Sequence, residues 1–202
     1  MTTIVLCGGR SRRLGRDKAL EEVGGKGLIE RVIERLAPLG AEIVLVTSER
    51  SRHLFSHLGL EIVTDDFPGR GPLGGIYSGL KASPGTHSLV VACDMPFLNS
   101  DLLGRLVELA PGHDVVIPRL EGKVEPLHAV YSRALLVPIE EMVREGALKI
   151  SDLLGRVKVR YVEAAECRRF DPELLSFFNV NSEADLGRAQ ALIERERTLF
   201  SI

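Results

Sequence analysis

Two glycines followed by a run of cations are the first residues with evident chemistry. Gly8-Gly9 ends a short apolar stretch, and residues 10–18 contain four arginines and one lysine. Glycine lets backbone N–H groups approach a ligand without an intervening side chain. Arginine and lysine side chains bind phosphate oxygens. The sequence therefore predicts a polyphosphate-binding loop directly after the first strand.

Two common phosphate-binding loops do not fit this segment. A Walker loop needs Gly-Lys followed by Ser or Thr, and the chain contains no such tripeptide. A dinucleotide fingerprint needs three glycines in the pattern G-x-G-x-x-G at the start of a helix. The next glycine after Gly8-Gly9 is Gly15, which breaks that spacing.

A carboxylate follows the buried strand predicted at residues 88–93. Asp94 comes directly after residues 88–93, and Pro96 ends the extended segment because proline removes a backbone donor. At the end of a buried strand, a carboxylate beside a phosphate-binding loop is suited to hold Mg²⁺. The alternative use of such an Asp is a turn or a helix cap.

The rest of the chain alternates apolar runs with helical patterns. Strands are predicted at 42–47, 60–64, 88–93 and 115–118, and apolar residues recur at helical spacing within 28–36, 73–80 and 102–107. Later the pattern predicts a hairpin at 121–123, strands at 127–131 and 157–162, and a last helix at 183–199 capped by Ser182. This alternation predicts an α/β fold with a mostly parallel, Rossmann-like sheet and a small antiparallel excursion in the second half.

Ligands of open α/β sheets bind beyond the carboxyl ends of the strands. Thr47 and Asp65 follow the second and third predicted strands, so we expect them at the same edge as Gly8 and Asp94. A carboxylate such as Asp65 can accept hydrogen bonds from the N1–H and N2–H of guanine. The antiparallel excursion is where a second substrate is expected.

The composition favours a globular protein that needs no disulfide framework or structural metal. The chain has 202 residues, 45% hydrophobic and 27% charged, with a net charge of −2. We expect a single domain over residues 1–202 and no affinity for nucleic acid. Three cysteines without a C-x-x-C pair argue for a reducing compartment, and no leader or membrane span is predicted, so the expected location is cytoplasmic.

The loop resembles the signature of the molybdenum cofactor guanylyltransferases, a family of α/β nucleotidyltransferases. Its pattern is L-x-G-G-x-S-x-R-x-G-x-D-K, and every fixed position is filled: Leu6, Gly8, Gly9, Ser11, Arg13, Gly15, Asp17 and Lys18. Four further segments are similar to family motifs, namely 71–76, 93–98, 125–131 and 179–182. The resemblance implies a three-layer nucleotidyltransferase fold across nearly the whole chain.

The resemblance also implies a reaction and its site. GMP passes from GTP to the terminal phosphate of Mo-molybdopterin, giving the guanine dinucleotide cofactor and pyrophosphate, with Mg²⁺ as cofactor and molybdoenzymes or their chaperones as recipients. The implied catalytic residues are Arg13, Lys18 and Asp94, with Asp94 binding the metal. The implied nucleotide-binding residues are Leu6, Cys7, Gly8, Gly9, Arg13, Lys18, Thr47, Asp65 and Asp94. The implied acceptor-binding residues are Pro126, His128, Asn179 and Asn181.

Two alternatives stay open at the level of sequence. The first is a related transferase with another base or acceptor, such as cytidylyl transfer to molybdopterin or guanylyl transfer to a small phosphorylated acid. Residues 47–50 lack the Asn that the family carries near the base, which weighs against guanine. The second is a non-catalytic carrier of nucleotide or cofactor. The presence of both Lys18 and Asp94 argues against a carrier.

Overall fold

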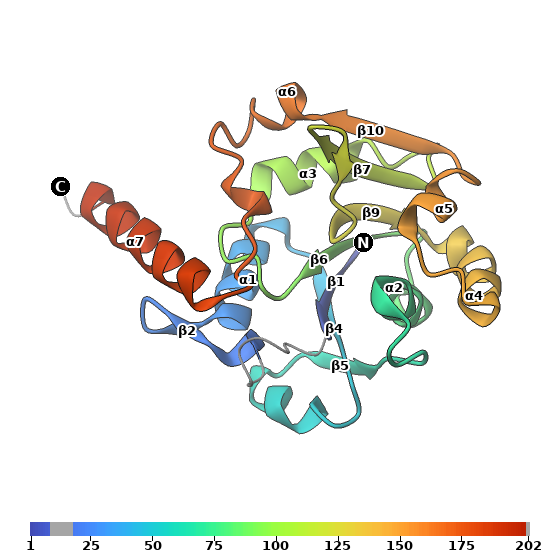
Figure 1. Cartoon of the computed structure of the whole chain (residues 1–202), viewed down its shortest axis with the longest axis horizontal. Coiled ribbons are helices and arrows are strands. Elements are labelled where there is room, and N and C mark those ends of the chain that lie inside the picture. The colour runs from blue at the N-terminus through green and yellow to red at the C-terminus, as the bar shows by residue number, and fades with distance from the viewer. Residues whose placement is uncertain (9–17, 201–202) are drawn as a thin grey trace.

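A mixed β-sheet forms the centre of the computed structural model, which describes residues 1–8 and 18–200. In these residues the sheet has eight strands, seven of them in the order β10-β7-β9-β6-β1-β4-β5, with β8 pairing β7 (Figure 1). The strands are β1 (Thr2–Cys7), β4 (Glu42–Thr47), β5 (Glu61–Thr64), β6 (His87–Ala92), β7 (Val115–Leu120), β8 (Lys123–Val124), β9 (His128–Ser132) and β10 (Val159–Glu163). The strands β1, β4, β5 and β6 are parallel, whereas β9 is antiparallel to both β6 and β7.

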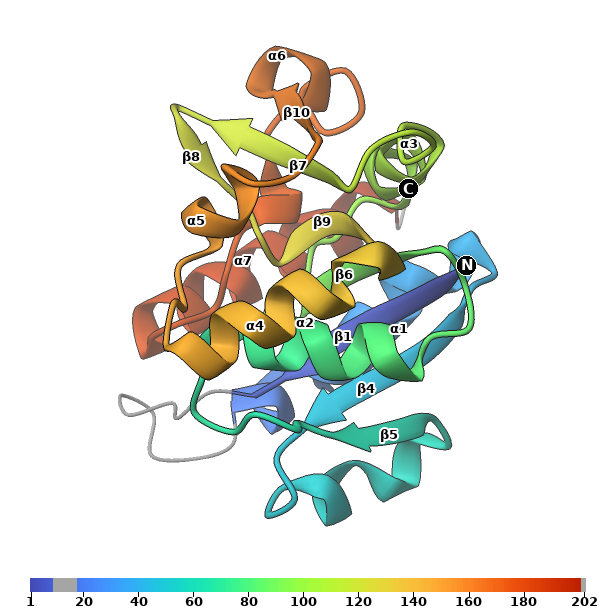
Figure 2. The ribbon, with the colours of Figure 1, turned by 90° about the vertical axis from the view of Figure 1, so that its right-hand side faces the viewer.

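Helices cover both faces of this sheet. Residues of α1 and α3 pack in one core cluster, and residues of α2, α4 and α5 pack in a second cluster on the opposite face (Figure 2). The α-helices are α1 (Leu28–Leu36), α2 (Gly71–Ala82), α3 (Ser100–Glu108), α4 (Leu136–Glu145), α5 (Ile150–Leu154), α6 (Ala164–Cys167) and α7 (Glu183–Phe200). Short 3₁₀ helices are η1 (Lys18–Leu20), η2 (Ala37–Leu39), η3 (Arg52–Leu58), η4 (Arg133–Leu135) and η5 (Leu175–Phe177), and β2 (Glu22–Val23) pairs with β3 (Lys26–Gly27) in a small hairpin.

The first strand is buried on both faces, which explains the apolar run from Ile4 to Cys7. Successive side chains of a strand point to opposite faces. Val5 and Cys7 therefore pack in the cluster of α1 and α3, while Ile4 and Leu6 pack in the cluster of α2 and α4. Strands covered on both faces by helices are expected to be continuously apolar rather than alternating.

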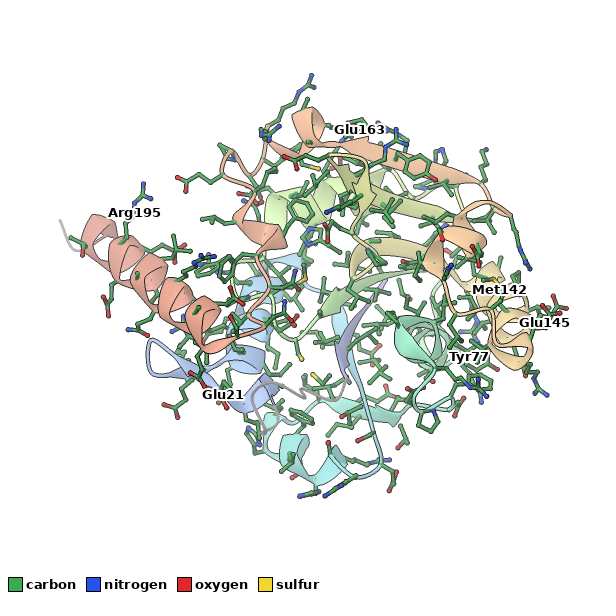
Figure 3. The ribbon with its side chains drawn as sticks, viewed as in Figure 1. Glu21, Tyr77, Met142, Glu145, Glu163 and Arg195 are labelled. Carbon is green, nitrogen blue, oxygen red and sulfur yellow. The ribbon has the colours of Figure 1, made fainter. Side chains whose placement is uncertain are left out.

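Two glycines let α2 lie directly on the sheet. A Cβ added to Gly79 would come within 2.5 Å of Ile4 Cγ2, and one added to Gly75 within 3.3 Å of Leu6 Cδ1. Pro72 lies in the first turn of α2, where its missing N–H costs nothing. On the outer side of α2, Tyr77 lies in the same core cluster as Met142 of α4 (Figure 3).

The last helix extends from the body of the molecule (Figure 1). Ala189 and Ile193 pack against Val23 and Leu28 in a third, smaller cluster. Arg195 is exposed further along the helix and points away from the sheet (Figure 3). In the described part of the chain, no helix is long and apolar enough to cross a membrane.

The mostly parallel sheet with its antiparallel excursion confirms the predicted fold class. The predicted hairpin forms at Glu121-Gly122, where both residues have positive φ, +50° and +80°. Asn99 caps α3 by accepting from Leu102 N at 2.9 Å, and Ser182 Oγ accepts from Asp185 N at 3.2 Å at the start of α7. The predicted strand at 127–131 begins one residue later, because residues 125–128 form a turn first.

Candidate active site

The carboxyl ends of the four parallel strands lie side by side at one edge of the sheet. Cys93 N donates to Leu6 O at 3.2 Å, joining the ends of β6 and β1. Asp65 N donates to Thr47 O at 2.9 Å, joining the ends of β5 and β4. The structure therefore brings the predicted residues of these four strand ends together, as the strand-end rule requires.

The hydroxyl of Thr47 is hydrogen-bonded within the protein. Its side chain is buried, and its hydroxyl donates to Cys7 O at 2.8 Å. This bond fixes the spacing between the ends of β1 and β4. A contact between Thr47 and a nucleoside stays a prediction.

Asp65 is held in one orientation by its own turn. Its Oδ1 accepts from Phe67 N at 2.9 Å and from Ser78 Oγ at 3.5 Å. A Cβ on Gly74 would lie only 2.8 Å from Phe67 O and 3.0 Å from Asp65 Oδ1, so glycine is required there for α2 to approach this turn. Partial burial raises the pKa of Asp65, against the opposing effect of its hydrogen bonds. The second oxygen, Oδ2, accepts no hydrogen bond from any described residue.

Asp94 lies at the end of β6 and is partly exposed. Its carbonyl oxygen accepts from Val180 N at 3.0 Å. This bond brings residues 175–181, which we call the C-terminal strap, against the end of β6. Within the strap, Asn179 Nδ2 donates to Phe177 O at 3.0 Å, and Asn181 N donates to Asp185 Oδ2 at 3.1 Å. Two segments that are distant in sequence thus meet at the same edge.

The predicted acceptor residues of the second half occupy a turn and a buried strand position. Pro126 lies in the turn before β9, and its carbonyl oxygen accepts from Tyr131 Oη at 2.9 Å. His128 begins β9 and is fully buried, with its ring 4.5 Å from that of Phe177. Neither ring nitrogen of His128 has a hydrogen-bond partner among the described residues. Burial lowers the pKa of His128 to about 3, so the ring is neutral. His128 therefore supports the strap from below, and direct contact with an acceptor stays a prediction.

Part of the predicted site lies outside the described residues. This applies to Gly9 and Arg13, and only the backbone of Lys18, at the start of η1, is described. Gly8 is exposed at the end of β1, and a Cβ there would meet no described atom within 4 Å. No described residue therefore blocks a ligand from approaching the backbone of Gly8.

The described residues include no group of three or more His, Cys, Asp or Glu side chains arranged to hold a metal. Mg²⁺ in nucleotide-dependent enzymes is commonly held by one or two carboxylates together with substrate phosphates and water. A single strand-end carboxylate such as Asp94 fits that mode and does not fit a metal cage built by the protein alone.

Sequence reasoning missed several residues that shape the site. Gly74 and Ser78 fix Asp65, and Phe177 covers His128. Glu125, which is partly buried in the turn before β9, was also missed as a site residue. The repeated glycines of α2 indicate that this helix packs closely on its neighbours. No sequence pattern indicates the contact between Phe177 and His128, because the two residues are 49 positions apart.

The mixed α/β fold of this chain is shared with solved structures of other proteins. A structure described as a nucleotidyl transferase from Methanothermobacter thermautotroptrophicus shares this fold, with a TM-score of 0.75 at 22% identity over 96% of this chain and 98% of that one. The chain belongs to the family of the MobA-like NTP transferase domain, whose model matches residues 3–160. It is an enzyme of this nucleotidyltransferase family.

Similar proteins carry more specific names. A probable molybdenum cofactor guanylyltransferase of Pelotomaculum thermopropionicum is 40% identical over 98% of this chain and 95% of its own length. A molybdenum cofactor guanylyltransferase of Desulfosudis oleivorans is 34% identical, with 98% of each chain covered. The crystal structure of molybdopterin-guanine dinucleotide biosynthesis protein A from Archaeoglobus fulgidus superposes with a TM-score of 0.86 at 34% identity, covering 96% of this chain and all of that one.

Proposed function

We propose that this enzyme transfers GMP from GTP to the terminal phosphate of Mo-molybdopterin, giving the guanine dinucleotide cofactor and pyrophosphate. The observation that carries the proposal is the bond between Val180 N and Asp94 O, which joins the strap to the parallel strand ends. A nucleotidyl transfer needs two substrates side by side at one carboxylate. The choice of GTP and Mo-molybdopterin as the two substrates is supported by the names of the similar proteins.

The chemistry needs no general base. The second pKa of a phosphate monoester is about 6, so the acceptor phosphate is largely dianionic near neutrality. One of its oxygens attacks the α-phosphorus of GTP, a new P–O bond forms, and the bond to the β-phosphate oxygen breaks to release pyrophosphate. No proton has to move in this step. The barrier is therefore charge repulsion and orientation, which positioning and electrostatic stabilisation reduce.

The chain's own residues supply the positioning. In this proposal the backbone N–H groups at Gly8 and Gly9 bind phosphate oxygens, and Arg13 and Lys18 neutralise the leaving pyrophosphate. Leu6 and Cys7 end the strand beside the nucleoside, with Thr47 bonded behind them. The acceptor lies on the side of the strap, near Pro126, Asn179 and Asn181.

Mg²⁺ is the cofactor of the proposed reaction, with Asp94 as its protein ligand. When bound, the metal supplies positive charge against the phosphates of GTP. The carboxylate of Asp94 lies at the strand end, and the remaining ligands would come from substrate and water.

Asp65 is the proposed acceptor of the guanine base. Its Oδ1 accepts from Phe67 N and Ser78 Oγ, and its Oδ2 accepts no bond from a described residue, so in this proposal the oriented carboxylate receives the N1–H and N2–H donors of guanine. Adenine offers no donor pair at these positions, and cytosine offers only its N4 amino group to the same carboxylate. A good bidentate contact contributes about 1–3 kcal/mol to such discrimination.

A competition experiment tests the proposal. Labelled GTP, CTP and ATP are incubated together with Mg²⁺, purified molybdopterin and the full chain, and product and pyrophosphate are quantified. GTP is expected to be incorporated in preference, with that preference weakened in Asp65→Asn. Equal incorporation of CTP would contradict the guanylyl assignment. Binding of GTP without any pyrophosphate release in the presence of acceptor would contradict the transfer itself.

A further inference from the structure

Glu125 occupies a turn at the acceptor end of the proposed site. Val124 pairs with Arg119 of β7, and His128 pairs with Val91 of β6, so residues 125–127 bulge between β7 and the end of β6. The turn is closed by bonds from Glu125 N to Pro118 O at 3.0 Å and from His128 N to Glu125 O at 3.1 Å. The backbone of Glu125 is therefore fixed at the edge of the sheet that carries Asp94.

The carboxylate of Glu125 is partly buried and has no bonded partner among the described residues. It accepts no hydrogen bond and forms no ion pair within residues 1–8 and 18–200. Burial raises the pKa of Glu125, and the nearby charge of Lys123 only partly opposes this effect. A partly desolvated carboxylate without a protein partner is able to accept hydrogen bonds from a ligand in place of water.

Asp65 is the counterpart of Glu125 on the other side of Asp94. Both carboxylates are partly buried, and burial raises the pKa of both. In the strand order β9-β6-β1-β4-β5, Glu125 precedes β9 and Asp65 follows β5. At about 4.8 Å per strand, these two positions are separated by about 19 Å along the sheet edge. Asp94 and Gly8 lie between them.

We propose that Glu125 binds the ring of the acceptor, by accepting from the ring N–H and the adjacent amino group of its aminopyrimidinone edge. This inference rests on the proposed function, in which the acceptor is a pterin. Guanine and pterin present the same pair of neighbouring donors. The two carboxylates thus bind one ring each, with the phosphates of both substrates between them.

The surroundings of the turn favour a ring on this side. The ring of Phe177 in the strap contacts the ring of His128, tilted by 47°, directly after the turn, and Val180 N donates to Asp94 O. The strap and the turn therefore both lie beside the end of β6, the strap with the aromatic ring of Phe177 and the turn with the carboxylate of Glu125. A flat ring with a donor edge matches that combination.

Ring binding is tested without the transfer reaction. The first probe is 6-hydroxymethylpterin monophosphate, and the second is the matching lumazine, in which an oxo group replaces the 2-amino group. Titration with the wild-type chain is expected to give at least about tenfold tighter binding of the pterin, the lower part of what a bidentate contact contributes. Equal affinities for the two probes would overturn the proposal in the unaltered protein.

Variants assign the preference to a residue. Glu125→Gln is expected to lose the preference for the pterin or to favour the lumazine, because the amide nitrogen donates where the carboxylate accepted. Glu121→Gln is the matched control, since Glu121 is exposed at the tip of the preceding hairpin, and it should keep the preference. A Glu125→Gln chain that still prefers the pterin would overturn the assignment.

Calorimetry with GTP separates the two possible rings. Glu125→Gln should bind GTP as the wild type does, whereas Asp65→Asn should bind GTP more weakly and keep the pterin preference. Loss of GTP affinity in Glu125→Gln would mean that Glu125 contacts guanine and would overturn the proposal. Pyrophosphate release with molybdopterin is measured separately, so failure of the proposed function is distinguishable from failure of ring recognition.

Discussion

The two halves of the sheet edge differ in how they treat their polar groups. On the side of β1, β4 and β5, Thr47 Oγ1 is bonded to Cys7 O, and Asp65 Oδ1 to Phe67 N. On the side of β9, the buried ring of His128 and the carboxylate of Glu125 have no bonded partners among the described residues. The first half therefore has its geometry fixed by internal bonds before any ligand arrives.

The difference shows which polar groups can gain binding free energy when a ligand pairs with them. A buried polar group without a partner costs about 1–3 kcal/mol, and a ligand that supplies the partner recovers it. The half with paired groups holds Asp65 in a fixed orientation towards the nucleotide, whereas the half with unpaired groups leaves the Glu125 carboxylate to be paired by an acceptor. Four changes test or sharpen this contrast.

Asp94 lies where the two halves meet, and its replacement should have the largest effect. Asp94→Asn is expected to keep the fold and to lose roughly 3 kcal/mol of transition-state stabilisation, on the order of a hundredfold in turnover or more. Pyrophosphate release gives the rate, and a thermal melt checks folding. Asp101→Asn, exposed in the first turn of α3, is the control. Near-normal turnover by folded Asp94→Asn would contradict the metal assignment.

His128 should make the second half sensitive to acid. Burial lowers its pKa from 6.5 to about 3, so below pH 6.5 the unfolded chain takes up a proton that the folded chain does not. Stability contributed by the neutral ring is thus present above pH 6.5 and is lost as the pH falls towards 3. Between pH 6.5 and 5 the loss amounts to about 2 kcal/mol.

Urea unfolding at several pH values measures this effect. His128→Leu should lose about 2 kcal/mol less than the wild type over the same pH interval. His57→Leu, at an exposed position in η3, is the control and should follow the wild type. Parallel pH profiles for the wild type and His128→Leu would show that the ring is not the titrating group.

The glycines of α2 test the rigidity of the first half. Gly79→Ala places a methyl group against Ile4, where an added Cβ would lie 2.5 Å from Cγ2, so overpacking should cost about 1–3 kcal/mol. Gly187→Ala in α7 meets no described atom within 4 Å and should gain up to about 1 kcal/mol from helix propensity. Denaturant unfolding of both variants measures the difference. An equally stable Gly79→Ala chain would mean that α2 can move away from β1.

The smallest effect is expected from the thiols at the site edge. Cys7 and Cys93 are 5% and 9% exposed, so alkylation by N-ethylmaleimide should be slow, and GTP with Mg²⁺ should slow it further. Cys167 is the internal control, because burial raises its pKa to about 11 and leaves little thiolate. Mass spectrometry identifies the modified residue. Equal rates with and without nucleotide would place both thiols away from the ligand.

The residues at the strand ends could be predicted from the sequence, but the contacts around them could not. Alternating strands and helices, with Asp65 and Asp94 at strand ends, follow from local periodicity and the rule for parallel sheets. The insertion of β9 between β6 and β7 does not, because pairing between strands far apart in sequence depends on the packing of the whole chain. For the same reason the sequence did not indicate that Thr47 would donate to Cys7 O or that Phe177 would cover His128.

The position of β9 also sets an order of assembly on the ribosome. Although β9 is made after β6 and β7, it lies between them and pairs with both. A nascent chain that ends before Ser132 therefore leaves the backbone groups of one side of β6 unpaired, and unpaired strand edges invite association with other chains. Chains released at Leu120 are expected to aggregate, and light scattering of such a truncated chain measures this. The part of the sheet beside the proposed acceptor site is thus completed only after β9 has been made.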